Sequence, residues 1–115
     1  FGVASAVAFD VVTLGVGDDG HTASMFPGLP TIRVRDRLVA AVGAQPEKGL
    51  EPRLTLTAPV LEASKLALVL CRGAKKRPLV AAARAAGSLD EIPSRVTQAI
   101  RGRVVWLLDA DAAGS

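Results

Sequence analysis

The sequence of 115 residues contains one cysteine, one histidine, one tryptophan, three phenylalanines and no tyrosine. A single cysteine excludes an internal disulfide and agrees with a reducing cytoplasm, so we expect a cytoplasmic protein. Cys71 lies in the apolar run 66–71 and is expected to be a buried small hydrophobic residue. The scarcity of aromatic side chains removes the stacking platforms on which single-stranded nucleic acids bind.

The sequence also lacks an apolar run of about 18 residues and a charged segment leading into a cleavage site, so no membrane partner is expected. Residues 1–9 are apolar but too short to span a bilayer. We interpret them as the end of a helix or a connector that belongs to a longer chain.

Half of the residues are hydrophobic, and most of these are Ala, Val and Leu, which suit buried parallel strands and close helix packing. The net charge of +3 favours an anionic partner, from a small phosphate ester to a nucleic acid. The eleven carboxylates mixed among the bases, and the lack of any nucleic-acid-binding signature, argue against a nucleic acid.

Strand-like and helix-like segments alternate along the chain, which predicts an α/β fold with an open, mostly parallel sheet and helices on its faces. Ligands of such sheets bind beyond the carboxyl ends of the strands, which here means the loops after Leu14 and Cys71. The patterns predict strands at 9–14, 53–57, 66–71 and 104–108, helices at 59–64, 75–86 and 92–100, a strand or short helix at 37–42, a loop at 43–52 and a frayed tail at 109–115.

The loop after Leu14 contains Gly15, Gly17 and Gly20, and then the only histidine, His21. Its glycines lack the spacing of a dinucleotide fingerprint, and no Gly-Lys-Ser/Thr follows as in a P-loop. A loop of this kind that opens onto a helix makes an anion or oxyanion site. A histidine at the end of a buried strand suits proton transfer near neutral pH. On residue types alone, His21 is equally well interpreted as the cap of a short helix beginning at Thr22.

Residues 9–28, FDVVTLGVGDDGHTASMFPG, closely resemble the active-site signature of the 6-phosphogluconolactonase family, LGMGxDGHTASLFP after a hydrophobic strand. The departures, Val16 and Met25, are conservative apolar exchanges. The resemblance continues through RLTLT at 53–57, GAKK at 73–76, PSR at 93–95 and WLLD at 106–109, so it covers essentially the whole chain.

The resemblance implies a three-layer αβα domain of the NagB/RpiA-like fold. Family members are normally longer, and their N-terminal half carries a Gly-Gly-rich phosphate loop and an Asp-Glu-Arg segment that do not occur here. We therefore expect residues 1–115 to be the C-terminal part of an incomplete domain, whose partner is the missing N-terminal half of the same chain.

The activity implied is hydrolysis of a phosphorylated sugar lactone, 6-phospho-D-glucono-1,5-lactone, with no metal and no organic cofactor. His21 matches the motif histidine and is expected to act as general base and then acid. Either Asp18 or Asp19 can be the carboxylate beside it, and the Asp-Gly-His triplet of the family favours Asp19. The resemblance further implies four substrate-binding residues: Gly17 and Gly20 in the loop, and Arg53 and Lys76 as cations for the phosphate.

Two other functions remain open. Glucosamine-6-phosphate deaminases share the Asp-Gly-His loop but usually continue Ile-Ala-Phe-Asn-Glu-Pro, whereas residues 22–27 here are TASMFP, which favours the lactonase. A non-catalytic fragment that binds a sugar phosphate is the second alternative, because the N-terminal half is missing. The neighbouring bases Lys75 and Arg77, and the group Arg33, Arg35 and Arg37, match no motif position and are expected to be solvated.

Overall fold

The structure, a computed structural model, describes residues 7–114, so most of the connector expected over residues 1–9 lies outside the described residues. In chain order the elements are β1 (Val12–Gly15), η2 (Pro30–Arg33), β2 (Val39–Val42), η3 (Pro46–Lys48), β3 (Arg53–Leu56), α1 (Ala58–Glu62), β4 (Leu66–Cys71), η4 (Ala74–Lys76), α2 (Arg77–Arg84), η5 (Pro93–Ala99), β5 (Arg103–Leu108) and α3 (Ala110–Ala113), where η marks a 3₁₀ helix.

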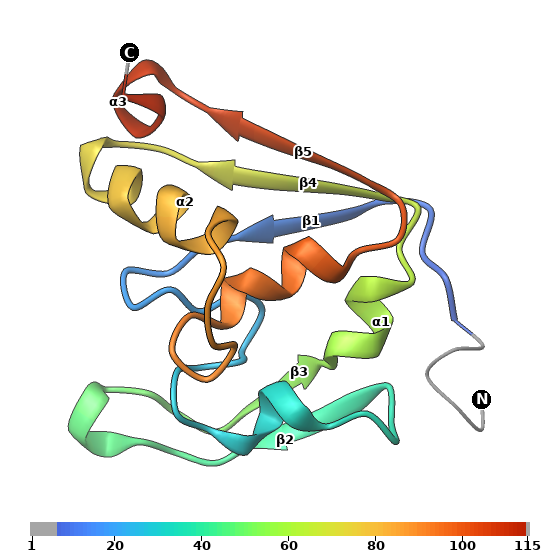
Figure 1. Cartoon of the computed structure of the whole chain (residues 1–115). Coiled ribbons are helices and arrows are strands. Elements are labelled where there is room, and N and C mark those ends of the chain that lie inside the picture. Colours follow the sequence, from blue (N-terminus) through green and yellow to red (C-terminus); the bar gives the residue numbers. More distant parts are fainter. Residues whose placement is uncertain (1–6, 115) are drawn as a thin grey trace.

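The strands β1, β4 and β5 form a parallel sheet in the order β1-β4-β5. Because Leu14 pairs with Val69 and Val69 with Trp106, these side chains share one face of the sheet. Residues 39–42, left open between strand and helix, form β2, which pairs antiparallel with β3 as a separate hairpin below the sheet (Figure 1). The predicted α/β class with a mostly parallel open sheet is confirmed.

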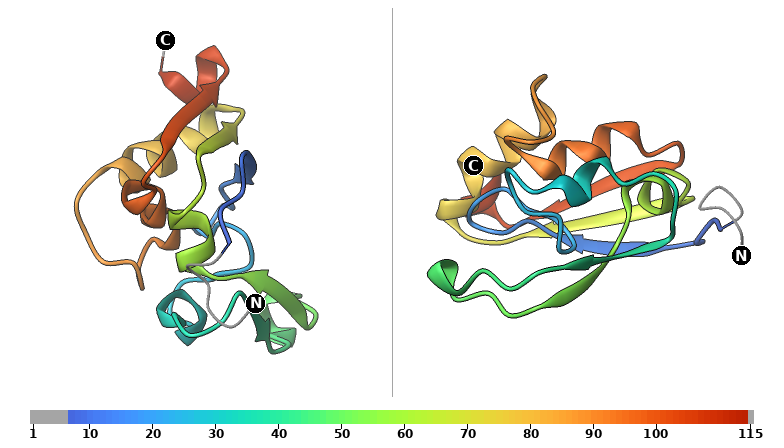
Figure 2. Two further views of the ribbon diagram at one scale, coloured as in Figure 1. Left: turned by 90° about the vertical axis from the view of Figure 1, so that its right-hand side faces the viewer. Right: turned by 90° about the horizontal axis from the view of Figure 1, so that it is seen from below.

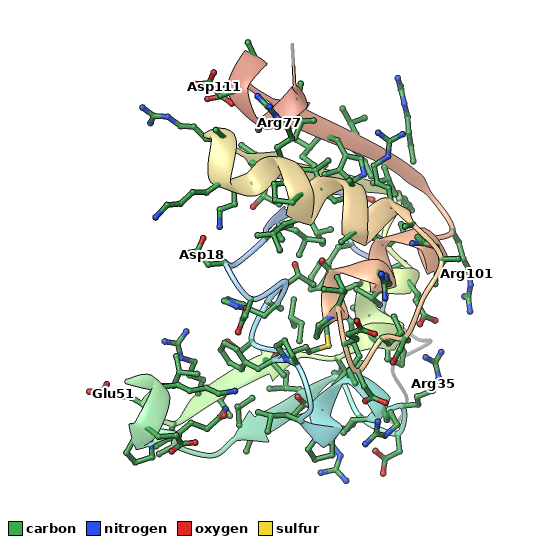
Figure 3. All side chains as sticks on the ribbon, turned by 60° about the vertical axis from the view of Figure 1, so that its left-hand side comes forward. Asp18, Arg35, Glu51, Arg77, Arg101 and Asp111 are labelled. Atoms are coloured by element: carbon green, nitrogen blue, oxygen red, sulfur yellow. The ribbon has the colours of Figure 1, made fainter. Side chains whose placement is uncertain are left out.

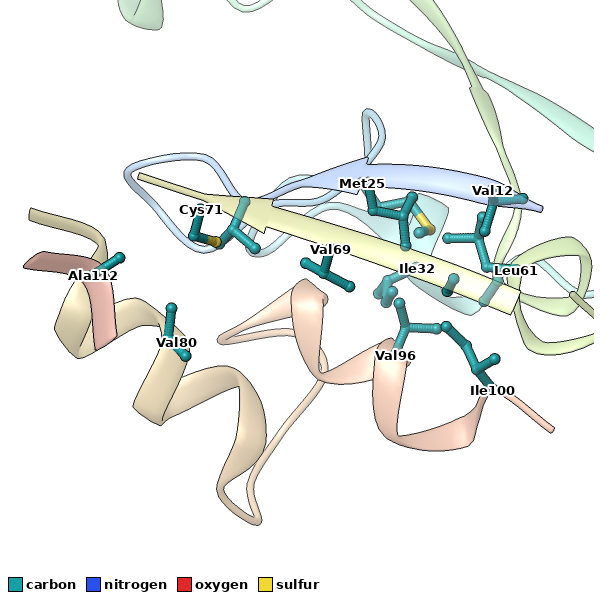
Figure 4. Close-up of a cluster of buried hydrophobic side chains, with 14 residues drawn as sticks. Val12, Met25, Ile32, Leu61, Val69, Cys71, Val80, Val96, Ile100 and Ala112 are labelled. Carbon is teal, nitrogen blue, oxygen red and sulfur yellow. The ribbon is translucent and has the colours of Figure 1, made fainter. Parts of the chain in front are cut away.

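Helices α1 and α2 and the segment η5 lie on one side of the parallel sheet (Figure 2). The face that they cover is apolar and buried, with Ala67 and Val69 of β4 fully inaccessible. Three apolar side chains pack onto these residues: Val80 of α2, Val96 of η5 and Ile100, which follows η5 (Figure 4). This packing holds the carboxyl end of β1 against the rest of the molecule.

The opposite face of the parallel sheet is apolar as well, but it is open to solvent. Val11, before β1, is 52% exposed, Leu70 of β4 is 50% exposed and Leu107 of β5 is 46% exposed. Parallel sheets are normally covered on both faces. Among residues 7–114, only one of the two faces has such a cover.

The structure corrects two predicted segments. The predicted helix at 92–100 is the 3₁₀ helix η5, which begins at Pro93. Within the predicted frayed tail at 109–115, residues 109–114 form the short helix α3 and its two caps. Asp109 is the N-cap of α3, because its carboxylate accepts a hydrogen bond from the backbone N–H of Ala112 at 2.9 Å. Across residues 7–114, the helices are all too short or too polar to cross a bilayer.

Candidate active site

The loop after β1 is held by hydrogen bonds within itself. The backbone N–H of Gly17 donates to the carbonyl of His21 at 2.8 Å, and that of Gly20 donates to the carbonyl of Gly17 at 2.9 Å. The hydroxyl of Thr22 donates to the carbonyl of Gly15 at 2.8 Å. These bonds place His21 at the carboxyl end of the strand, where an α/β sheet binds its ligands.

No helix follows this loop. Ala23 and Ser24 form a turn, and Thr22 and Met25 on either side of it pair in an isolated antiparallel bridge. The alternative that His21 caps a helix at Thr22 is therefore wrong. The expectation that the loop opens onto a helix N-terminus is wrong as well, so the helix dipole contributes nothing to anion binding there.

Asp19, rather than Asp18, contacts His21. One carboxylate oxygen of Asp19 accepts from the backbone N–H of His21 at 3.0 Å and lies 2.5 Å from its Nδ1. Burial acts to raise the pKa of the Asp19 carboxyl, but the hydrogen bonds from His21 outweigh burial and hold the pKa below its usual value. A negative Asp19 fixes the ring orientation through Nδ1, which leaves Nε2 as the ring nitrogen that Asp19 does not bond.

This geometry predicts a pH-dependent effect of Asp19→Asn. Because the pKa of Asp19 in the folded state lies below its ordinary value of 3.8, ionised Asp19 stabilises the fold at neutral pH. That contribution is lost as the pH falls through the folded-state pKa. We expect Asp19→Asn to lower the free energy of unfolding at pH 7, and the difference from the parent to shrink steadily below pH 3.8. Urea unfolding at several pH values measures this; a difference that does not change with pH would contradict it.

Gly17 leaves the space that the imidazole occupies. A Cβ atom at position 17 would lie 2.0 Å from Cε1 and 2.1 Å from Nδ1 of His21. Gly20 has φ +89°, a backbone conformation that L side chains rarely adopt. The N–H groups of both glycines are already bonded inside the loop, so these two residues shape the site rather than donate to a ligand.

Lys76 reaches this loop from the connection between β4 and α2. Its Nζ donates to the carbonyl of Val16 at 2.5 Å and to the Asp18 carboxylate at 3.0 Å. The hydrogen bond and the charge of Lys76 hold the pKa of Asp18 below its usual value. The loops after β1 and β4 therefore meet, and Asp18 lies on the side of the molecule between α2 and the β2–β3 hairpin (Figure 3).

Arg53, the first residue of β3, approaches the loop through Phe26. The guanidinium carbon of Arg53 lies 5.7 Å from the centre of the Phe26 ring, and that ring lies 4.5 Å from the imidazole of His21. Phe26 itself is 1% exposed. Arg53 and Lys76 thus belong to the surroundings of His21 although they are distant from it in sequence.

Two hollows flank this cluster. One cavity of 440 Å³ has His21, Leu56 and the loop residues 15–17 among its walls. The other, of 490 Å³, contains Arg53, Glu51 and Ser24. The imidazole of His21 thus lines a cavity large enough for a small ligand, and the guanidinium of Arg53 lines the second cavity.

The remaining predicted positions behave as ordinary surface or core. Cys71 is buried, and burial raises the pKa of its thiol. Lys75 is exposed. Arg77 is exposed as well, but its Nε donates to the backbone carbonyl of Asp111 at 3.0 Å, and the two residues lie near each other in Figure 3. The three bases after the loop are exposed and form ion pairs: Arg33 with Asp90, Arg35 with Glu62, and Arg37 with Asp36.

The sequence offered Asp18 only as an alternative neighbour of His21, and it did not single out Phe26. Asp18 falls at a position where the family signature accepts any residue, so nothing in the string predicts its contact with Lys76. Phe26 stands inside the signature, five residues after His21, and it is one of only three phenylalanines. The rarity of phenylalanine was the sequence feature that could have drawn attention to Phe26. Within residues 7–114, no three His, Cys, Asp or Glu side chains gather as a metal site would require.

Nearly the whole chain resembles proteins of one known family. A family model described as glucosamine-6-phosphate isomerases/6-phosphogluconolactonase matches residues 2–106. The chain is 46% identical to a 6-phosphogluconolactonase of Nostoc over 94% of its length, and 35% identical to that of Homo sapiens over 95%. It spans 43% and 42% of the length of these two relatives.

Solved structures of similar shape carry the same name. A 6-phosphogluconolactonase structure from Trypanosoma brucei superposes with a TM-score of 0.80 at 33% identity, covering 93% of this chain and 42% of that one. One from Trypanosoma cruzi has a TM-score of 0.81 at 29% identity, with 94% and 41% covered. A monomeric glucosamine-6-phosphate deaminase, with a TM-score of 0.68 at 20% identity, shares the fold alone.

Proposed function

The chain belongs to the glucosamine-6-phosphate isomerase/6-phosphogluconolactonase family, and from this we propose that it is the histidine-bearing C-terminal part of a 6-phosphogluconolactonase. The proposed reaction is hydrolysis of 6-phospho-D-glucono-1,5-lactone to 6-phosphogluconate, in the pentose phosphate pathway of the cytoplasm. One observation carries the proposal: His21, paired with Asp19, lines a cavity, and the cations Lys76 and Arg53 approach the same loop from other elements.

The chemistry begins with a water molecule next to Nε2 of His21. His21 removes a proton as the water oxygen bonds to the lactone carbonyl carbon, and the imidazolium so formed is stabilised by ionised Asp19. The proton then passes from His21 to the ring oxygen as its bond to that carbon breaks, which yields a carboxylic acid and a free hydroxyl group. Loop N–H groups other than those of Gly17 and Gly20 are the proposed donors to the oxyanion.

Lys76 and Arg53 are the proposed phosphate ligands. Lys76 is a flexible ammonium only 22% exposed at the loop, and Arg53 carries the planar fork that binds phosphate oxygens in pairs. The ammonium of Lys76 donates a hydrogen bond to the Asp18 carboxylate. A bound phosphate dianion would replace Asp18 as the acceptor of the Lys76 hydrogen bond.

Lys76→Ala is expected to raise the KM for the phosphorylated lactone by about 10- to 100-fold with little change in kcat, because a charged hydrogen bond contributes about 1.5–3 kcal/mol. Steady-state kinetics measure this. Lys75→Ala is the matched control, since Lys75 is the neighbouring, exposed lysine. Equal effects of the two substitutions would show that Lys76 acts only through general surface charge.

The open sheet face supports the proposal that residues 1–115 are part of a larger domain. The exposed side chains of Val11, Leu70 and Leu107 form an apolar surface that the remaining part of a family member would cover. We propose that the N-terminal half of the same chain is this cover and completes the third layer of the αβα fold.

The activity is therefore tested in a chimaera in which residues 1–115 replace the matched segment of the Nostoc relative. We expect the chimaera to hydrolyse 6-phospho-D-glucono-1,5-lactone and to leave glucosamine 6-phosphate intact, because residues 22–27 lack the Asn-Glu pair of the deaminases. Release of ammonia from glucosamine 6-phosphate would instead support the deaminase. A folded chimaera that binds 6-phosphogluconate without turning over either substrate would support the non-catalytic fragment.

A further inference from the structure

Phe26 contacts both side chains on which the proposed chemistry depends, the imidazole of His21 and the guanidinium of Arg53. Its ring lies 4.5 Å from the imidazole of His21, with the two planes inclined at 45°. The guanidinium carbon of Arg53 lies 5.7 Å from the centre of the same ring, inside the range of a cation–π contact. One buried side chain therefore connects the acid/base residue with a phosphate ligand 32 positions away.

The imidazole is restrained on three sides. Asp19 holds Nδ1, the backbone of Gly17 lies where a Cβ atom would overlap the ring, and Phe26 lies against it as a rigid aromatic surface. Asp19 is 42% exposed, whereas Phe26 is 1% exposed, so the ring of Phe26 is the restraint least able to move.

Arg53 lacks a comparable anchor among the hydrogen bonds and ion pairs of residues 7–114. No carboxylate pairs with its guanidinium, and its side chain stands in the exposed hollow beside Glu51 and Pro52. The aromatic face of Phe26 is then the contact that favours one direction of the Arg53 side chain. A cation–π contact at an exposed site is weak, so it biases the Arg53 rotamer without immobilising it.

We propose that Phe26 is a positioning residue that sets the separation between the proton-transfer nitrogen of His21 and the guanidinium of Arg53. This rests on the proposed function. It implies that Phe26 contributes to selection of phosphorylated over unphosphorylated lactones, although it touches neither the water nor the phosphate. A lactone without a phosphate does not use Arg53. Its hydrolysis therefore depends on the contact of Phe26 with His21 and not on the contact of Phe26 with Arg53.

The test compares F26L, which removes the ring, with F26Y, which keeps it. L61A is the control for lost core packing, because Leu61 is fully buried but lies beside Val12 at the opposite end of β1 from the loop (Figure 4). His21 is the only histidine, so the proton on its Cε1 gives one unambiguous NMR signal in the chain itself. We expect the ring current of Phe26 to displace this signal, F26L to abolish the displacement, and F26Y and L61A to retain it.

In the chimaera, F26L is expected to lower the ratio of kcat/KM for 6-phospho-D-glucono-1,5-lactone over D-glucono-1,5-lactone by about tenfold, with F26Y close to the parent. An unchanged histidine signal in F26L, or an equal loss of the ratio in L61A, would overturn the proposal. Because the NMR signal needs no substrate, a chimaera without lactonase activity would overturn the proposed function and leave the contact between Phe26 and His21 measurable on its own.

Discussion

Turnover of 6-phospho-D-glucono-1,5-lactone by the chimaera is expected to fall by about 10²-fold or more on His21→Ala, with KM little changed. Among the described residues that line the loop cavity, His21 alone carries a side chain that can both accept the proton of water and return it to the ring oxygen. Asp19 remains in place in this variant. Its carboxylate lies on the Nδ1 side of the space that the ring occupied, so it does not reach a water that the proposed mechanism places next to Nε2.

The stability of the fold is expected to survive His21→Ala, because the imidazole is 28% exposed and belongs to the loop rather than to the core. Urea unfolding of the same variant therefore serves as the control. Full turnover in a normally folded His21→Ala protein would remove His21 from the mechanism.

Gly17→Ala is expected to reduce kcat by about 10²-fold although it adds only a methyl group, because a displacement of about 1 Å in a reacting group costs that much. The added Cβ would lie 2.0 Å from Cε1 of His21, far inside van der Waals contact. The backbone of Gly17 is itself bonded to the carbonyl of His21, so the imidazole is the part that has to move. Its displacement breaks the contact between Nδ1 and Asp19.

Gly15→Ala is the matched control for this effect. Gly15 is the last residue of β1, two residues before Gly17, and a Cβ atom there meets nothing within 4 Å. The two substitutions are chemically identical, so a general sensitivity of the loop to alanine would appear in both. Steady-state kinetics that show equal losses, or no loss with Gly17→Ala, would contradict the account of Gly17 as space for the imidazole.

The sequence predicted the parallel strands well because each is a short apolar run bounded by glycine or by polar residues. It failed where pairing depends on contacts between distant segments. The run 53–57 alternates as a strand, but periodicity says nothing about its partner, and it pairs with β2 in the hairpin rather than with the parallel sheet. The segment η5 has a helical composition, and only Pro93 hinted at its start.

The same distinction holds for the candidate site. The choice of Asp19 over Asp18 as the neighbour of His21 followed from the Asp-Gly-His triplet, and the structure places Asp19 there. The helix expected after the loop does not form, because Thr22 uses its hydroxyl to bond back to Gly15. The ion pair between Asp18 and Lys76 joins residues 58 positions apart, and the contacts of Phe26 depend on packing that no local pattern encodes.

The most direct test of the central claim is the rate of 6-phospho-D-glucono-1,5-lactone hydrolysis by the chimaera, measured beside the parent Nostoc protein. If residues 1–115 supply the catalytic histidine, its Asp19 partner and the phosphate ligands Arg53 and Lys76, the kcat/KM of the chimaera is expected to lie within about tenfold of the parent, since the replaced parts are equivalent. A folded chimaera that hydrolyses the lactone no faster than buffer would contradict the claim.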